Sequence, residues 1–115
     1  MNGDTYNIFQ YSTPKVIFTF VHTDGKPVDL SAASTVTLVV LPDIMADEGP
    51  VTPVAASAAT VYNATKGQVA YTFTAEQTAD YGMFQVMAVI QNTDGTVYTL
   101  PEMNDMWLWI KARGY

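Results

Sequence analysis

Short apolar runs separated by glycine, proline and aspartate extend along the whole chain. The runs are rich in threonine, valine, tyrosine and phenylalanine, which is typical of strands separated by turns. No segment has a convincing 3.6-residue period, and 75–81 predicts one helical turn at most. The pattern predicts seven strands, at Lys15–His22, Thr35–Leu41, Ala59–Tyr62, Gln68–Thr74, Gly82–Asn92, Thr96–Leu100 and Met106–Ala112, with a possible eighth within Thr5–Tyr11.

Strands of this length and spacing predict an all-β fold, specifically an antiparallel two-sheet β-sandwich of seven or eight strands. A closed small barrel is the alternative architecture. We expect one domain at 15–115, preceded by residues 1–14 as an N-terminal arm or an edge strand. The segment 42–57 carries three prolines and three acids, and it predicts a long loop within that domain.

Two turns share the sequence Thr-Asp-Gly, at 23–25 and at 93–95. Aspartate closes such a turn and glycine takes the positive φ that the chain reversal needs, so each predicts a β-hairpin. If Gly95 lies in a bulge, Ile90 falls opposite Tyr98 and Ala88 falls opposite Leu100. This register places apolar residues together, which supports it.

Strand alternation leaves a group of large apolar side chains outside the predicted core. Along 82–92 and 106–112, one face carries core residues and the other carries polar residues mixed with methionine and tryptophan. Exposed apolar patches mark partner surfaces, and Trp and Met are enriched at interfaces. We therefore predict an interface, unless the N-terminal segment or the long loop covers this face. Its members are Met83, Met87, Val89, Trp107 and Trp109.

Composition excludes several classes of partner. The chain of 115 residues is 49% hydrophobic and 14% charged, with a formal net charge of −6 and no cysteine. Its five basic residues are scattered along the sequence, so we expect neither a nucleic-acid partner nor a membrane partner. The first ten residues lack the features of a signal peptide, so we expect a soluble chain made in the cytoplasm.

Residues that could carry chemistry are few. His22 is the single histidine and stands at the mouth of the first turn without an evident orienting partner. Asp43, Asp47 and Glu48 match no calcium-loop spacing, which favours a solvated acidic loop. Asn63-Ala64-Thr65 matches a glycosylation sequon but lacks a secretory signal. We expect no cofactor, no metal site and no enzymatic activity.

An ordered set of short motifs extends from the first turn to the last strand. The set comprises Asp24-Gly25-Lys26-Pro27-Val28-Asp29-Leu30, Gly67-Gln68-Val69-Ala70-Tyr71, Gly82-Met83-Phe84, Asp94-Gly95-Thr96 and Thr99-Leu100-Pro101. Over roughly 85 to 90 residues, this order resembles the immunoglobulin-like domains of tailed-bacteriophage virions, especially the N-terminal domain of the upper baseplate protein family. The 42–57 loop is longer and richer in proline than that family's pattern.

The resemblance implies a non-catalytic structural or adhesive component of a phage particle, made in the host cytoplasm and located in the virion. Such a component would lie in the baseplate, tail, neck or capsid surface and would contact other virion proteins, with a homo-oligomer as one arrangement. No functional residues transfer with the resemblance. The alternative is a carbohydrate-binding β-sandwich module, in which Tyr71, Tyr98, Trp107 and Trp109 would supply stacking planes. An accessory domain of an enzyme is a third alternative.

Overall fold

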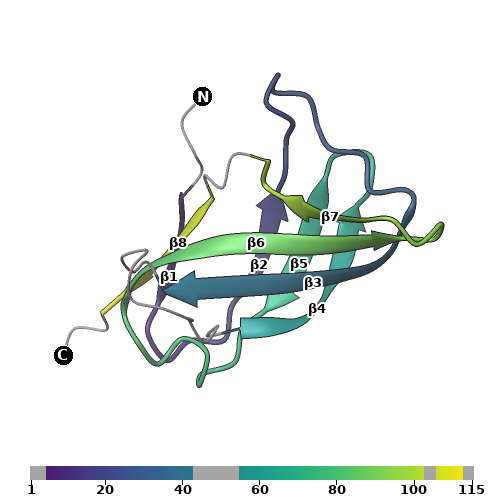
Figure 1. Ribbon diagram of the computed structural model, residues 1–115. Coiled ribbons are helices and arrows are strands. Elements are labelled where there is room, and N and C mark those ends of the chain that lie inside the picture. The colour runs from purple at the N-terminus through teal and green to yellow at the C-terminus, as the bar shows by residue number, and fades with distance from the viewer. Residues whose placement is uncertain (1–4, 43–54, 103–105, 113–115) are drawn as a thin grey trace, which may run out of the picture.

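The computed structural model describes residues 5–42, 55–102 and 106–112, and this part of the chain is all-β without a helix (Figure 1). The predicted all-β class is therefore confirmed. None of the described residues belongs to a helix long and apolar enough to cross a membrane. The eight strands are β1 (Thr5–Phe9), β2 (Lys15–Thr19), β3 (Ala33–Pro42), β4 (Ala55–Asn63), β5 (Gln68–Thr72), β6 (Gly82–Asn92), β7 (Val97–Leu100) and β8 (Trp107–Lys111).

One path of hydrogen-bonded neighbours connects these strands, in the order β1-β8-β6-β3-β4-β5-β2, and β7 also pairs with β6. The long strand β6 pairs with β3 along one edge, and its other edge pairs with β8 near its start and with β7 near its end. β1 runs parallel to β8, while the other pairs are antiparallel. The sheet is therefore mixed, whereas the sequence predicted an antiparallel arrangement.

Strand β4 connects the two parts of the sheet, because its first half pairs with β3 and its second half pairs with β5. A register shift between Val61 and Asn63 accompanies the second pairing. Such irregularities bend a strand and increase its twist. Hydrogen bonding is thus continuous through one strongly curled sheet, and the predicted antiparallel two-sheet sandwich is not confirmed.

The core lies on the inner side of this curl. The Tyr6 ring on β1 packs edge-on against Phe18 on β2, with 4.8 Å between ring centroids, and Phe18 contacts Phe73 at 6.4 Å. The Thr19 N–H also donates a hydrogen bond of 3.0 Å to the Tyr6 hydroxyl. The first and last strands of the pairing path therefore meet across the core. Fully buried side chains include Phe18, Phe20, Leu38, Val86, Ile90 and Leu108.

Both Thr-Asp-Gly turns form, but only the second joins two paired strands, β6 and β7, as predicted; the first closes an isolated bridge between Val21 and Pro27. In the first turn the His22 N–H donates to the Lys26 carbonyl at 2.8 Å, and in the second the Asn92 N–H donates to the Thr96 carbonyl at 2.8 Å. The register after the second turn is also confirmed, because Ile90 pairs with Tyr98. These turns depend on neighbours in the sequence, which explains why the local pattern predicts them.

The largest difference between a predicted and an observed strand boundary concerns β4. β4 begins at Ala55, inside the predicted 42–57 loop, whose residues 43–54 lie outside the described part of the chain. Alanine and serine are poor strand formers, so the run from Ala55 to Ala58 carries little local strand signal. Near the start of the chain, Thr5–Phe9 forms an edge strand beside β8, in agreement with the predicted eighth strand within Thr5–Tyr11.

Candidate interaction surface

The five residues predicted as an interface lie on the outer side of β6 and β8. Met83 is 38% exposed and Trp109 is 46% exposed, while Met87, Val89 and Trp107 are half-buried. Alternating residues on the same strands, such as Phe84 and Leu108, point inward and are buried. The outward orientation follows from this alternation. Whether the surface binds a partner stays a prediction.

Cross-strand pairing joins these side chains into one surface. Met83 pairs with Trp109, and Gln85 pairs with Trp107, while Met87 pairs with Val39 of β3. On the other side of β8, Phe9 of β1 pairs with Lys111. We call this set the tryptophan face and define it by Phe9, Met83, Met87, Val89, Trp107, Trp109 and Lys111.

Lys111 carries the formal charge of the tryptophan face. Its Nζ lies 5.3 Å from the centroid of the Trp109 ring and 5.8 Å from the centroid of the Phe9 ring. Cation–π contacts of this kind contribute about 0.5–1 kcal/mol each at exposed sites. Among the described outward residues of β1, β8, β6 and β3, the others are neutral. The surface therefore combines large apolar side chains with neutral polar ones such as Asn7 and Gln85, and Lys111 is its one described cation.

Phe9 was missed at the sequence level because the parallel pairing of β1 with β8 has no local signal. The pairing also bears on the alternative in which the N-terminal segment covers this surface. Thr5–Phe9 lies beside Trp107–Lys111 as a neighbouring strand in the sheet, and 58% of the Phe9 side chain is exposed. The described part of the N-terminal segment thus extends the tryptophan face.

The four aromatic side chains considered for sugar binding do not share one surface. Tyr71 is 7% exposed, packs against Phe73 and accepts a hydrogen bond of 2.7 Å from Gln77 Nε2. Tyr98 is half-buried, and its pairing with Ile90 places it on the core side. Burial, followed by the nearby charge of Asp29, raises the pKa of Tyr98. Only the two tryptophans of that set lie on the tryptophan face.

The polar candidates take part in turns. His22 Nδ1 lies 3.3 Å from Glu102 Oε1, and the same carboxylate oxygen accepts the Thr23 N–H at 3.0 Å. This contact ties the first turn to the segment after β7. Asn63 Oδ1 accepts hydrogen bonds from the Thr65 hydroxyl and the Lys66 N–H within its own turn. Asp43, Asp47 and Glu48 lie outside the described residues.

Comparison with protein-family models and with curated proteins found no match for this chain. The assignment of the tryptophan face as a candidate interface therefore depends on the sequence and structure of this chain alone.

Proposed function

We propose that this chain is a non-catalytic structural or adhesive component of a phage particle that docks onto other proteins through the tryptophan face. The observation that carries the docking role is the group of outward apolar side chains on β1, β8 and β6, which includes both tryptophans and carries one cation on a chain whose net charge is −6. An apolar patch that stays exposed on a monomer favours a partner that covers it.

The composition of the surface supports protein docking. Interface cores are depleted of charge and enriched in aromatic residues and methionine, and tryptophan is prominent among residues that dominate binding energy. The three strands that carry the face, two of five residues and one of eleven, give a projected area of about 330 Å² with polar positions included, at about 3.3 Å per residue and 4.8 Å spacing. This is comparable to the largest apolar patches on monomers, roughly 300–600 Å².

The strand pairing supports the more specific proposal that the all-β fold is an immunoglobulin-like sandwich. In the seven-stranded form of that fold, the second strand pairs with the fifth, the third with the sixth, and the seventh lies beside the sixth. The pairs β2–β5, β3–β6 and β6–β7 follow this scheme. Strands that change sheets through a bend make the corners of such sandwiches, and β4 would take that position.

A phage role implies repeated copies at symmetric positions in the virion, after synthesis in the host cytoplasm. Closed symmetry is the usual arrangement of repeated soluble chains, so we take a second copy as the first partner to test. Other virion proteins in the baseplate, tail, neck or capsid surface would be further partners. Neither nucleic acid nor membrane is part of the proposal.

The test compares self-association of the wild-type chain with that of surface variants by sedimentation velocity. Trp109→Lys places a second cation on the tryptophan face and is expected to abolish association, and Met87→Ala is expected to weaken it. Tyr62→Lys is the matched control, because Tyr62 is 56% exposed on β4 and lies outside the tryptophan face. Circular dichroism should show all variants folded. Equal association of Trp109→Lys and wild type would contradict the proposal.

A further inference from the structure

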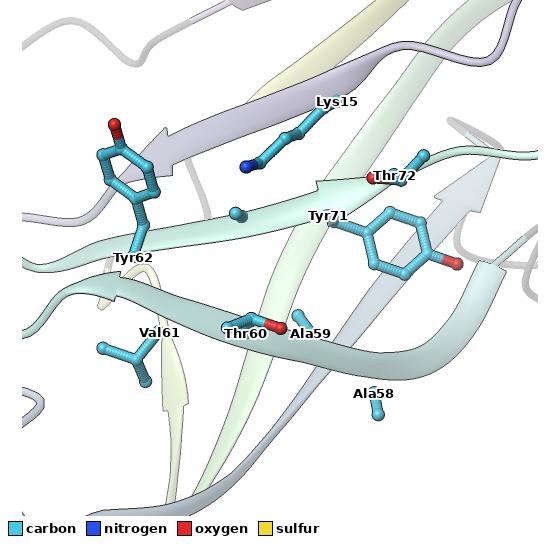
Figure 2. Close-up of a pocket in the computed structure, with 9 residues that line it drawn as sticks. Lys15, Ala58, Ala59, Thr60, Val61, Tyr62, Tyr71 and Thr72 are labelled. Carbon is cyan, nitrogen blue, oxygen red and sulfur yellow. The ribbon is translucent and has the colours of Figure 1, made fainter.

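Strands β4 and β5 pair over only part of their length and then separate, leaving a fork (Figure 2). Pairing between them reaches Thr60 and Ala70; beyond this point β4 pairs with β3 and β5 pairs with β2. Figure 2 shows the Tyr71 ring between the diverging strands. The fork forms a groove of about 530 Å³ lined by residues of β4, β5 and β2.

The β4 side of the groove includes a strand edge with which no other described strand pairs, and we call it the open edge of β4. Among the described residues, Ala55–Ala59 pairs with β3 only, so alternate N–H and C=O groups of this segment point toward the fork. Ala56, Ser57 and Ala58 are exposed in succession. Ser57 is exposed even though it pairs with Leu38, which is fully buried. Both faces of the strand are therefore accessible at this edge.

Edge strands are usually protected from pairing with other chains by charges, prolines or covering segments. The segment from Ala55 to Asn63 contains neither a charged residue nor proline. The side chains of Ala58 and Ala59, which line the fork, are small and leave space for another backbone to approach. A second polypeptide strand matches this surface, because only a backbone supplies both donors and acceptors at strand spacing.

Lys15 supplies the formal charge of the groove. No acid is among the described residues that line it, although the chain has eleven acids and five bases. The Lys15 Nζ lies 5.6 Å from the centroid of the Tyr62 ring, which holds the ammonium at the end of the groove (Figure 2). The exposed Thr60 and Thr72 side chains add hydroxyl groups nearby. The charge of the groove therefore complements an acidic side chain.

We propose that the fork binds an extended, acidic segment of a partner protein, which adds as a strand to the open edge of β4 and places a carboxylate near Lys15. This inference shares with the proposed function only the premise that the chain binds proteins. The surface and the mode of binding differ. Main-chain hydrogen bonds would dominate binding at the fork, whereas apolar contacts would dominate binding at the tryptophan face.

The test is an NMR titration of the full chain with a blocked eight-residue peptide of alternating threonine and glutamate at millimolar concentration. Amide shifts are expected at Ala58, Thr60 and Thr72, which line the groove. The same peptide methylated at its backbone nitrogens cannot donate main-chain hydrogen bonds and is expected to cause no shifts there. A threonine–lysine peptide is expected to bind more weakly, because it would meet Lys15.

Variants connect any binding to the groove. Lys15→Gln is expected to weaken binding roughly two- to fivefold, the range for an exposed ion pair. Ala58→Tyr fills the groove and is expected to weaken binding about tenfold or more. Lys26→Gln and Ala75→Tyr make the same changes at exposed positions outside the groove and should bind as the wild type does.

Trp109→Lys should also bind the peptide as the wild type does. A negative result for docking through the tryptophan face can therefore be distinguished from a negative result for peptide binding at the fork. The inference is overturned if the threonine–glutamate peptide shifts none of the lining amides, or if Ala58→Tyr binds it as well as the wild type does. Equal binding of the N-methylated peptide would exclude strand addition. If trigalacturonate, an acidic oligosaccharide, shifts these amides and the peptide does not, the groove binds acidic sugars instead.

Discussion

Replacing Gly67 by alanine tests how the turn between β4 and β5 holds the end of β2. Gly67 has φ of +69°, and its carbonyl accepts the Phe20 N–H at 2.9 Å. A Cβ added at Gly67 would lie 2.4 Å from the carbonyl oxygen of Phe20 and 2.8 Å from that of Val28. Both neighbours are main-chain atoms, so relief requires movement of the backbone.

The expected loss of stability has two parts. A left-handed conformation costs an alanine about 1–2 kcal/mol. Displacing packed main chain adds about 1–3 kcal/mol, by analogy with overpacked cores. Gly25→Ala is the matched control, because Gly25 has φ of +86° and a Cβ there meets nothing within 4 Å. Gly67→Ala should therefore cost about 2–5 kcal/mol and Gly25→Ala only about 1–2 kcal/mol.

Urea denaturation followed by tryptophan fluorescence measures both variants. The midpoint should fall further for Gly67→Ala, and the slope of the transition should match that of the wild type. Equal destabilisation by the two variants would refute the reasoning, because it would mean that the close approach of Gly67 to Phe20 and Val28 does not exist.

Two further predictions concern strand orientation and pH. Leu108→Ala should cost about 2–5 kcal/mol of folding stability because Leu108 is fully buried. Trp109→Thr should cost only about 1–2 kcal/mol, from the partial burial of Trp109 and its lost contact with Lys111. Thermal unfolding compares the two variants, and equal losses of stability would contradict the outward placement of Trp109. The Thr96 hydroxyl and N–H, which donate to Asp94 Oδ1 at 2.6 and 3.0 Å, lower the pKa of Asp94 below its ordinary 3.8. The stabilisation by Asp94 is therefore present above pH 3.8 and lost as pH falls through the lower folded pKa; Asp94→Asn should reduce this acid dependence in urea titrations, and an unchanged profile would contradict it.

Local patterns predicted those parts of the structure that depend on neighbours in the sequence. The Asp-Gly turn at 93–95 determines the pairing of β6 with β7 because the chain reverses within three residues. Alternation along Gly82–Asn92 likewise separates Phe84 and Val86 from Met83 and Met87, because the side-chain period of a strand is two. The outward orientation of the β6 and β8 residues of the tryptophan face therefore follows from sequence alone, whereas the addition of Phe9 depends on the pairing of β1 with β8.

Features that depend on distant pairing could not be predicted in this way. The parallel pairing of β1 with β8 joins residues about a hundred positions apart, and nothing in Thr5–Phe9 specifies that partner. The early start of β4 was missed because Ala55–Ala58 has low strand propensity and is held by pairing with β3. The fork between β4 and β5 is a consequence of those two pairings, so the groove was not foreseen.

Light scattering coupled to size exclusion, over a range of concentrations, tests the central claim most directly. The monomer has a mass of 12.6 kDa. If the tryptophan face docks onto a second copy, the wild-type mass should rise with concentration toward a defined multiple of this value, and Trp109→Lys should remain at the monomer mass. A wild-type mass that stays at 12.6 kDa at every concentration would contradict docking between copies through this face.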